Sequence, residues 1–286
     1  MRDVVIVPCY ERPEYTRLCL EYLAQARGVQ DKEIWLCEDS HISEPEDRMK
    51  NMLPVVAYGY NTFAHFQHYV QLAHATYGNS FNLVGSLQRA YESGAERIFL
   101  VEDDIIVAPD IFEWHEETLD RAYPLVSCAT ALNKSAHFQI NGPMAMDESY
   151  KNPNAYKRTI GPYSSHAAAF SRNCLGGLIQ YFNDKQFTWE PGLEQDVRIQ
   201  QYLAVRGHRS IWPYVPRAYN VGVYSYHINT GQRLQGTLEE KVRVLDSVIK
   251  DPNLLRNMSA NNSAVTPIPA AWPVRTAPIH EWTGRR

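Results

Sequence analysis

Short apolar runs rich in β-branched residues alternate with amphipathic segments along the first part of the chain. Continuous apolar runs of this kind are typical of strands buried on both faces of a parallel sheet. The expected strands are residues 3–10, 33–40, 54–61 and 97–104. Residues 13–27 and 80–93 carry apolar side chains at helical spacing, and a glycine follows each of these expected helices. The alternation predicts an α/β fold with right-handed crossovers.

The second part of the chain has a less regular pattern. Residues 133–166 are rich in Asn, Pro, Gly, Ser and Tyr, which predicts long loops with short strands. The later expected elements are a strand leading into a helix over residues 165–182, a helix over 194–207, a strand over 208–215 and a helix over 238–251. From Asn253 the chain is polar and then rich in proline, so we expect an extended tail that wraps the domain or is partly disordered.

The composition is that of a globular protein. The 286 residues are 44% hydrophobic and 21% charged, which is enough to form a sizeable core. A formal net charge of -4 argues against a basic surface dedicated to nucleic acid or anionic lipid. The five cysteines form no CxxC pair, which fits reduced thiols. Because no apolar run reaches the length of a membrane span and a strand is expected directly after Met1, we expect no signal peptide, no membrane span and a cytoplasmic location.

Acidic residues follow two of the expected strands. Glu38 and Asp39 close the second strand, and Glu102, Asp103 and Asp104 come directly after an apolar run. Ligands of open α/β sheets bind at the carboxyl ends of the strands. Adjacent carboxylates repel one another and are hard oxygen ligands, so they indicate a Mn²⁺ or Mg²⁺ site that substrate phosphates complete. The alternative is a solvated acidic turn or a helix N-cap.

Three residues in the second half are further candidates. Glu194 and Asp196 begin the expected helix 194–207, where a carboxylate either caps the helix or takes a proton from an acceptor hydroxyl. His227, in NVGVYSYHINTG, is either a metal ligand or an ordinary hydrogen-bonded histidine. His65 and His68 are expected on one helix face, as a solvated polar stripe rather than a metal site.

Several blocks of the sequence resemble the nucleotide-sugar glycosyltransferases of GT-A fold, and most closely the N-acetylglucosaminyltransferase I type. The blocks are VVIVPCYERPEYTRLCLEYL, WLCEDS and FLVEDDIIVAPDIFEW, with later likeness at WEPGLEQDVRIQQYLAVRGHRSIWP and RAYNVGVYSYHINTG. The resemblance implies an α/β, Rossmann-like, mostly parallel sheet flanked by helices, with an irregular C-terminal acceptor-binding half. It implies a donor-binding half at residues 1–125, an acceptor-binding and catalytic-base half at 126–250, and a Pro-rich tail at 251–286.

The resemblance also implies a role for each candidate residue. Asp104 would bind the metal, and His227 would lie near it as a further ligand. Glu102 and Asp103 would contact metal-bound water, ribose or the sugar, and Asp39 would accept a hydrogen bond from uracil. The loop that cradles the nucleoside would comprise Pro8, Cys9, Tyr10 and Arg12. From their charge alone, Arg89 and Arg217 are candidate diphosphate partners, and the favoured alternative for each is a surface ion pair. Asp196, or else Glu194, would be the catalytic base.

The function implied is that of an inverting, metal-dependent glycosyltransferase with a UDP-sugar donor such as UDP-N-acetylglucosamine or UDP-glucose. The acceptor is expected to be a glycan, a glycoprotein or a small molecule, in a bacterial or phage-infected cell. A modified DNA base is an alternative acceptor, because NAYKRTIGPYSSH combines basic and aromatic side chains. A sugar-1-phosphate nucleotidyltransferase is less favoured because the loop PCYERPEYT contains no glycine. A catalytically silent carbohydrate-binding module is the remaining alternative.

Overall fold

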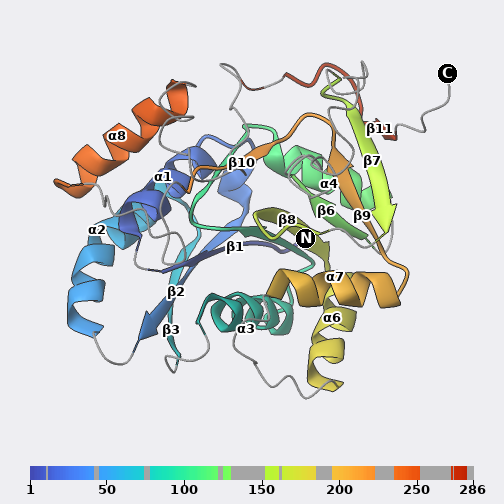
Figure 1. Cartoon of the computed structure of the whole chain (residues 1–286), viewed down its shortest axis with the longest axis horizontal. Coiled ribbons are helices and arrows are strands. Elements are labelled where there is room, and N and C mark those ends of the chain that lie inside the picture. The colour runs from blue at the N-terminus through green and yellow to red at the C-terminus, as the bar shows by residue number, and fades with distance from the viewer. Residues whose placement is uncertain are drawn as a thin grey trace.

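The centre of the protein is a mixed sheet of nine strands, in the order β11-β7-β9-β6-β8-β4-β1-β2-β3 (Figure 1). The computed structural model describes residues 1–10, 12–41, 45–73, 78–121, 125–129, 152–160, 163–184, 195–222, 235–251, 272 and 274–281. The strands of the large sheet are β1 Asp3–Cys9, β2 Glu33–His41, β3 Phe66–Ala73, β4 Arg97–Val101, β6 Leu125–Cys128, β7 Ala155–Ile160, β8 Ala167–Ser171, β9 Arg209–Pro213 and β11 His280–Glu281. A second, two-stranded sheet pairs β5 Ile105–Val107 with β10 Ala218–Asn220.

Helices cover both faces of the large sheet (Figure 1). They are α1 Pro13–Leu23, α2 Pro45–Thr62, α3 Gly78–Glu92, α4 Ile111–Arg121, α6 Arg172–Asp184, α7 Gln195–Val205 and α8 Leu238–Lys250, with a short 3₁₀ turn, η1, at Val29–Asp31. Side chains alternate between faces along a strand, so Val5 and Val7 pack with α1, α2 and α4. Val4 and Ile6 pack on the other face with α3, α6 and α7. The result is a three-layer α/β structure, as the sequence predicts.

Four strands run in the same direction and bring their carboxyl ends to one edge. β1 pairs in parallel with β2 and β4, and β2 pairs in parallel with β3. The register places Cys9 opposite Glu38, near the ends of β1 and β2. The two acidic clusters therefore lie at the same edge of the sheet, as expected from their positions after strands.

The strand expected at residues 54–61 is wrong, because these residues belong to helix α2. The buried positions in this segment are Met52, Val55 and Gly59, followed by Phe63. This spacing of three and four residues is the face of a helix, and it overrides the strand preference of the β-branched side chains. The third strand is β3, which begins at Phe66.

The helix expected around His65 and His68 is also wrong. His68 lies on strand β3, opposite Leu36 of β2. Its Nε2 is 2.8 Å from Oε2 of Glu38, a buried residue two positions further along β2. His68 is therefore the partner of a buried carboxylate rather than part of a solvated stripe.

The other expected elements of the second half are confirmed. The strand leading into a helix is β8 followed by α6, and the expected helix, strand and helix that follow are α7, β9 and α8. Part of the tail wraps the domain, because β11 pairs in parallel with β7. Arg275 forms ion pairs with Glu113 and Glu117 of α4, which fixes this segment against the helix.

Candidate functional site

The acidic triplet occupies the turn between β4 and β5, and it meets an arginine from the first loop. Asp103 and Asp104 are buried, with 4% and 8% of their surface exposed. Arg12, directly before α1, donates from Nη1 to Oδ2 of Asp104 over 2.9 Å and from Nη2 to Oδ1 of Asp103. Oε1 of Glu102 and Oδ2 of Asp103 are buried and accept no hydrogen bond from the described residues. The turn thus holds more negative charge than Arg12 alone neutralises.

The electrostatics of the triplet follow from its burial. Burial raises the pKa of Glu102 above its ordinary value, and the neighbouring charge of Asp104 raises it further, against a hydrogen bond from Ser165. Burial also raises the pKa of Asp103, although Arg12 opposes this effect. A cation placed among these oxygens would offset both the cost of burying the carboxylates and their mutual repulsion, so the turn favours positively charged ligands.

Strand β10 supplies a second partner to Asp104 that the sequence did not reveal. Nδ2 of Asn220 donates to Oδ1 of Asp104 over 3.2 Å, and the backbone N–H of Gly222 donates to Oδ1 of Asn220 over 2.9 Å. The backbone N–H of Val221 donates to the carbonyl oxygen of Asp104 over 2.9 Å. Asp104 is therefore held on both carboxylate oxygens, by Arg12 and by Asn220.

The carboxyl ends of β1 and β2 form the wall beside the triplet. Pro8 and Cys9 are buried, Tyr10 is partly exposed, and Asp39 is 3% exposed. Cys9 lies opposite Glu38 in the pairing of β1 and β2, and the charges of Asp103 and Glu38 add to burial in raising the pKa of its thiol. The structure thus brings the loop predicted to cradle a nucleoside next to the predicted metal-binding turn.

Asp196 reaches the same region from the other half of the chain. It lies in the first turn of α7, where Oδ1 accepts a hydrogen bond from the N–H of Val197 over 2.7 Å. Its negative charge contributes to the raised pKa of Glu102. Next to it, Oγ of Ser80 on α3 donates to Oε1 of Gln195 over 2.6 Å. This bond links the beginnings of α3 and α7.

Other predicted site residues lie elsewhere. Arg89 is in the last turn of α3, with its guanidinium carbon 4.5 Å from the centroid of the Tyr69 ring, and its described contacts are not with the triplet. Arg217 is completely buried, donates to the carbonyl oxygen of Val215 over 2.5 Å and pairs with Asp110 at 3.5 Å, so the structure places it in an ion pair inside the protein. Glu194 and His227 lie outside the described residues.

The surface proposed for a DNA acceptor is only partly available. Tyr156 and Tyr163 are buried, with 3% and 5% of their surface exposed, so neither ring is free to stack on a base. Arg158, between them, pairs with Glu281 of β11 at 3.3 Å. Its described strand, β7, lies between β11 and β9 in the sheet.

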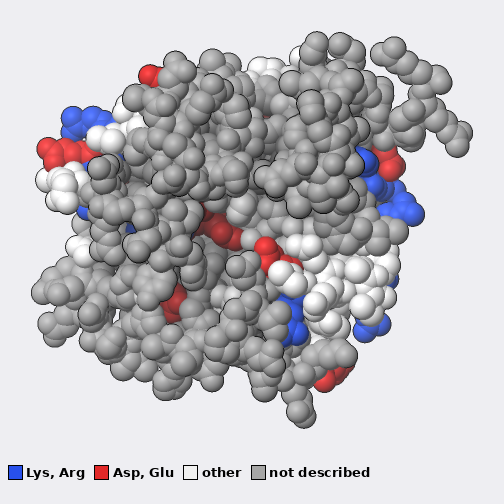
Figure 2. Space-filling view, viewed as in Figure 1, with Lys and Arg blue, Asp and Glu red and all other residues white. Residues whose placement is uncertain are grey.

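The charge distribution over one face agrees with an acidic site. Figure 2 shows Asp and Glu side chains near the centre of this face, whereas most of the visible Lys and Arg side chains lie towards its edges. In the described part of the chain, no three His, Cys, Asp or Glu side chains come together as a complete metal site. The donors present are hard carboxylate oxygens, two of them without a hydrogen-bond partner among the described residues, and they fit Mn²⁺ or Mg²⁺ bound with substrate phosphates.

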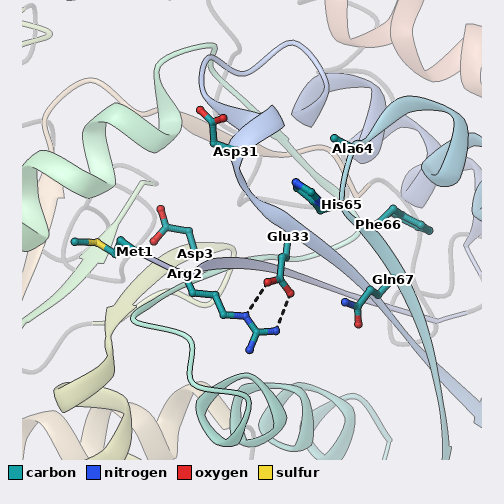
Figure 3. Close-up of a pocket in the computed structure, with 9 residues that line it drawn as sticks. All are labelled: Met1, Arg2, Asp3, Asp31, Glu33, Ala64, His65, Phe66 and Gln67. Carbon is teal, nitrogen blue, oxygen red and sulfur yellow. Dashed lines mark hydrogen bonds and ion pairs between the residues drawn. The ribbon is translucent and has the colours of Figure 1, made fainter.

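A separate cavity of about 740 Å³ lies at the opposite edge, at the amino ends of β1, β2 and β3 (Figure 3). Across it, Arg2 donates to both oxygens of Glu33 over 2.7 and 2.9 Å. Beside it, Asp3 pairs with Lys32 at 2.9 Å and with Arg97 at 2.8 Å. These charged groups satisfy one another, and we assign no ligand to this cavity.

The whole fold is similar to that of known glycosyltransferases. The mannosyltransferase PcManGT from Pyrobaculum calidifontis, in complex with GDP-Man and Mn²⁺, superposes with a TM-score of 0.54 at 14% identity, over 94% of this chain and 77% of that one. Residues 1–349 of S. aureus TarS in complex with UDP-GlcNAc superpose with a TM-score of 0.53 at 14% identity, over 92% of this chain and 74% of that one. The chain has the α/β GT-A fold of these enzymes.

The sequence comparisons give no closer relative. No family model and no curated protein sequence matches the chain. Within the described residues, no helix combines the length and the apolar character that crossing a membrane requires.

Proposed function

We propose that the protein is an inverting, metal-dependent glycosyltransferase that moves a sugar from a UDP-sugar to an acceptor hydroxyl. One observation carries the proposal: Asp103 and Asp104, buried in the turn after β4, pair with Arg12 of the β1 loop, and the charge of Asp196 in α7 acts on Glu102 of the same turn. A direct displacement requires the leaving diphosphate and the catalytic base to lie on opposite faces of the anomeric carbon. The similarity in fold to enzymes solved with GDP-Man and UDP-GlcNAc supports the same reading.

The donor side is formed mainly by residues from the first half of the chain. Asp104 would hold the cation, with His227 of the second half as a proposed further ligand, and Glu102 and Asp103 would contact metal-bound water, ribose or the sugar. Asp39 is proposed to accept a hydrogen bond from uracil, beside the loop of Pro8, Cys9, Tyr10 and Arg12. When bound, the cation would offset the charge that develops on the leaving diphosphate. UDP-N-acetylglucosamine and UDP-glucose are the donors that the resemblance favours.

The chemical step is assigned to Asp196. Its carboxylate would accept the proton of the acceptor hydroxyl while that oxygen attacks the anomeric carbon from the face opposite the diphosphate. One displacement of this kind inverts the anomeric configuration. Ser80 and Gln195 hold the helix that carries Asp196 and so keep the base aligned with the donor. A glycan, glycoprotein or small molecule remains the favoured class of acceptor, since Tyr156 and Tyr163 are buried rather than exposed for base stacking.

Calorimetric titration with UDP tests the donor site. The wild-type protein is expected to bind UDP in Mn²⁺ buffer and to lose most of this affinity in EDTA. Asp104→Asn, which keeps the side-chain volume, should behave in Mn²⁺ as the wild type does in EDTA. The matched control is Asp184→Asn, because Asp184 is exposed at the end of α6 and contacts Gln180. Binding of GDP in preference to UDP would overturn the assignment of uracil as the nucleobase of the donor. Absence of any nucleotide binding would overturn the proposed function.

A further inference from the structure

The two carboxylate oxygens of Asp104 have partners of different kinds. Oδ1 accepts a hydrogen bond from Nδ2 of Asn220 over 3.2 Å, and Oδ2 accepts one from Nη1 of Arg12 over 2.9 Å. Asn220 is a neutral donor, whereas Arg12 is a cation. Arg12 precedes Asp104 in the sequence, in the loop after β1, whereas Asn220 follows it, in β10. The two oxygens are therefore in unequal environments.

The partner of Oδ1 is fixed by the backbone around it. Asn220 lies opposite Ile105 in the antiparallel pairing of β10 with β5. The N–H of Gly222 donates to Oδ1 of Asn220 over 2.9 Å, and this bond directs the Nδ2 of the same amide towards Asp104. The N–H of Val221 donates to the carbonyl oxygen of Asp104 over 2.9 Å, so both the main chain and the side chain of Asp104 are tied to this turn.

The partner of Oδ2 is the long side chain of Arg12, which reaches the carboxylate from the loop before α1. The Arg12 side chain is 19% exposed and lies outside any helix or strand. Its guanidinium bridges Asp104 and Asp103, so it occupies the position between the two carboxylates that a divalent cation would take. A guanidinium and a divalent cation on the same oxygen would repel each other strongly in a buried site. Occupation by one therefore excludes the other.

We propose that Asp104 has one fixed and one exchangeable oxygen: Asn220 positions the carboxylate through Oδ1, and Arg12 occupies Oδ2 until a divalent cation replaces it. The inference deepens the proposed function, on which it rests for the identity of the cation. Arg12, once displaced, remains beside the site and is available to an anionic diphosphate. The cation and the nucleotide should then bind together more tightly than either binds alone.

Manganese titration without nucleotide tests both halves of the proposal, because the two substitutions act in opposite directions. Free Mn²⁺ is followed by electron paramagnetic resonance in wild type, Arg12→Met and Asn220→Ala. Arg12→Met should bind Mn²⁺ about tenfold more tightly, because the competing charge is gone. Asn220→Ala should bind it about tenfold more weakly, because the ligand is no longer oriented. Arg17→Met is the control, since Arg17 pairs with Glu21 at 2.8 Å on α1 and its loss changes the net charge equally.

Several outcomes would overturn the proposal. Unchanged or weaker Mn²⁺ binding by Arg12→Met would refute the exchange, and unchanged binding by Asn220→Ala would refute the positioning role. If Asn220→Ala unfolds, Asn220→Ser replaces it, because serine keeps a small polar side chain. Asn220→Ser should also bind Mn²⁺ more weakly than wild type. Opposite effects on Mn²⁺ without any binding of UDP would sustain the exchange while refuting the proposed donor. Absence of Mn²⁺ binding in both wild type and Arg12→Met would refute the exchange itself.

Discussion

Gly222 lies so close to Asp104 that a β-carbon at position 222 would be 2.5 Å from Oδ2 of the aspartate. The same β-carbon would be 3.2 Å from Oδ1 of Asn220. The side chain of Asp104 therefore fills space that only a glycine leaves open. This close approach, rather than an unusual backbone angle, is the reason for a glycine at the end of β10.

We expect Gly222→Ala to displace the carboxylate of Asp104 without unfolding the protein, because the atom that clashes is the end of a side chain. The affinity for Mn²⁺ and for UDP in the presence of Mn²⁺ should fall by about tenfold or more. Calorimetric titration measures this loss, and a thermal melt checks the fold. The control is Gly177→Ala, whose β-carbon would lie 2.3 Å from the hydroxyl of Tyr202. It should lower the melting temperature and leave UDP affinity unchanged, and equal affinity in Gly222→Ala and wild type would refute the role assigned to Gly222.

Asp196→Asn should separate donor binding from turnover. The variant keeps the size of the side chain but cannot accept the acceptor's proton, so turnover should fall by about a hundredfold or more. The affinity for UDP should stay within a factor of about two, because Asp196 is not among the contacts assigned to the donor. The effect is measured on donor hydrolysis and on sugar transfer, both monitored through the release of UDP. A variant with full turnover would show that another group is the base, and Glu194 would be the next candidate.

The sequence predicted the part of the site that local pattern encodes. Residues 98–101 are buried on both faces of the sheet, which requires a continuous apolar run. The acidic triplet comes directly after this run, so the sequence places it at the end of the strand. The contribution of Asn220 was not predictable in this way, because it lies 116 residues from Asp104 and meets it only through the pairing of β10 with β5. The β-branched residues of 54–61 predicted a strand, but tertiary packing makes this segment part of helix α2, in which Val55 and Gly59 are buried at helical spacing.

Ser80→Ala tests whether the link between α3 and α7 aligns the base. The substitution removes the donor to Gln195, which is 8% exposed, and leaves a largely buried amide oxygen without this partner. The free energy of unfolding should fall by about 1–3 kcal/mol. Turnover should fall by about tenfold with little change in UDP affinity, because α7 carries Asp196 and not the donor contacts. Ser80→Thr, which retains a hydroxyl, should recover most of the turnover, and failure of this rescue would leave only a structural role.

His115 should make stability depend on pH below neutrality. The residue is 1% exposed, and burial lowers its pKa from 6.5 to about 3, so the folded protein keeps the imidazole neutral. Below pH 6.5 the unfolded chain binds a proton at this position that the folded chain does not, and the stability present above pH 6.5 is lost as the pH falls towards 3. Between pH 6.5 and 5 the loss should reach about 2 kcal/mol, at about 1.4 kcal/mol for each pH unit.

The comparison that isolates this effect is urea unfolding of wild type and His115→Gln at pH 7.5 and pH 5. Glutamine does not titrate, and Ser127 keeps its hydrogen bond with Thr118 at 2.6 Å in the variant. The variant should be the less stable protein at pH 7.5, because it lacks the buried imidazole. Because glutamine does not titrate, its free energy of unfolding should fall by about 2 kcal/mol less than that of wild type on going to pH 5. Equal losses in His115→Gln and wild type would mean that the folded protein protonates His115 as readily as the unfolded chain does.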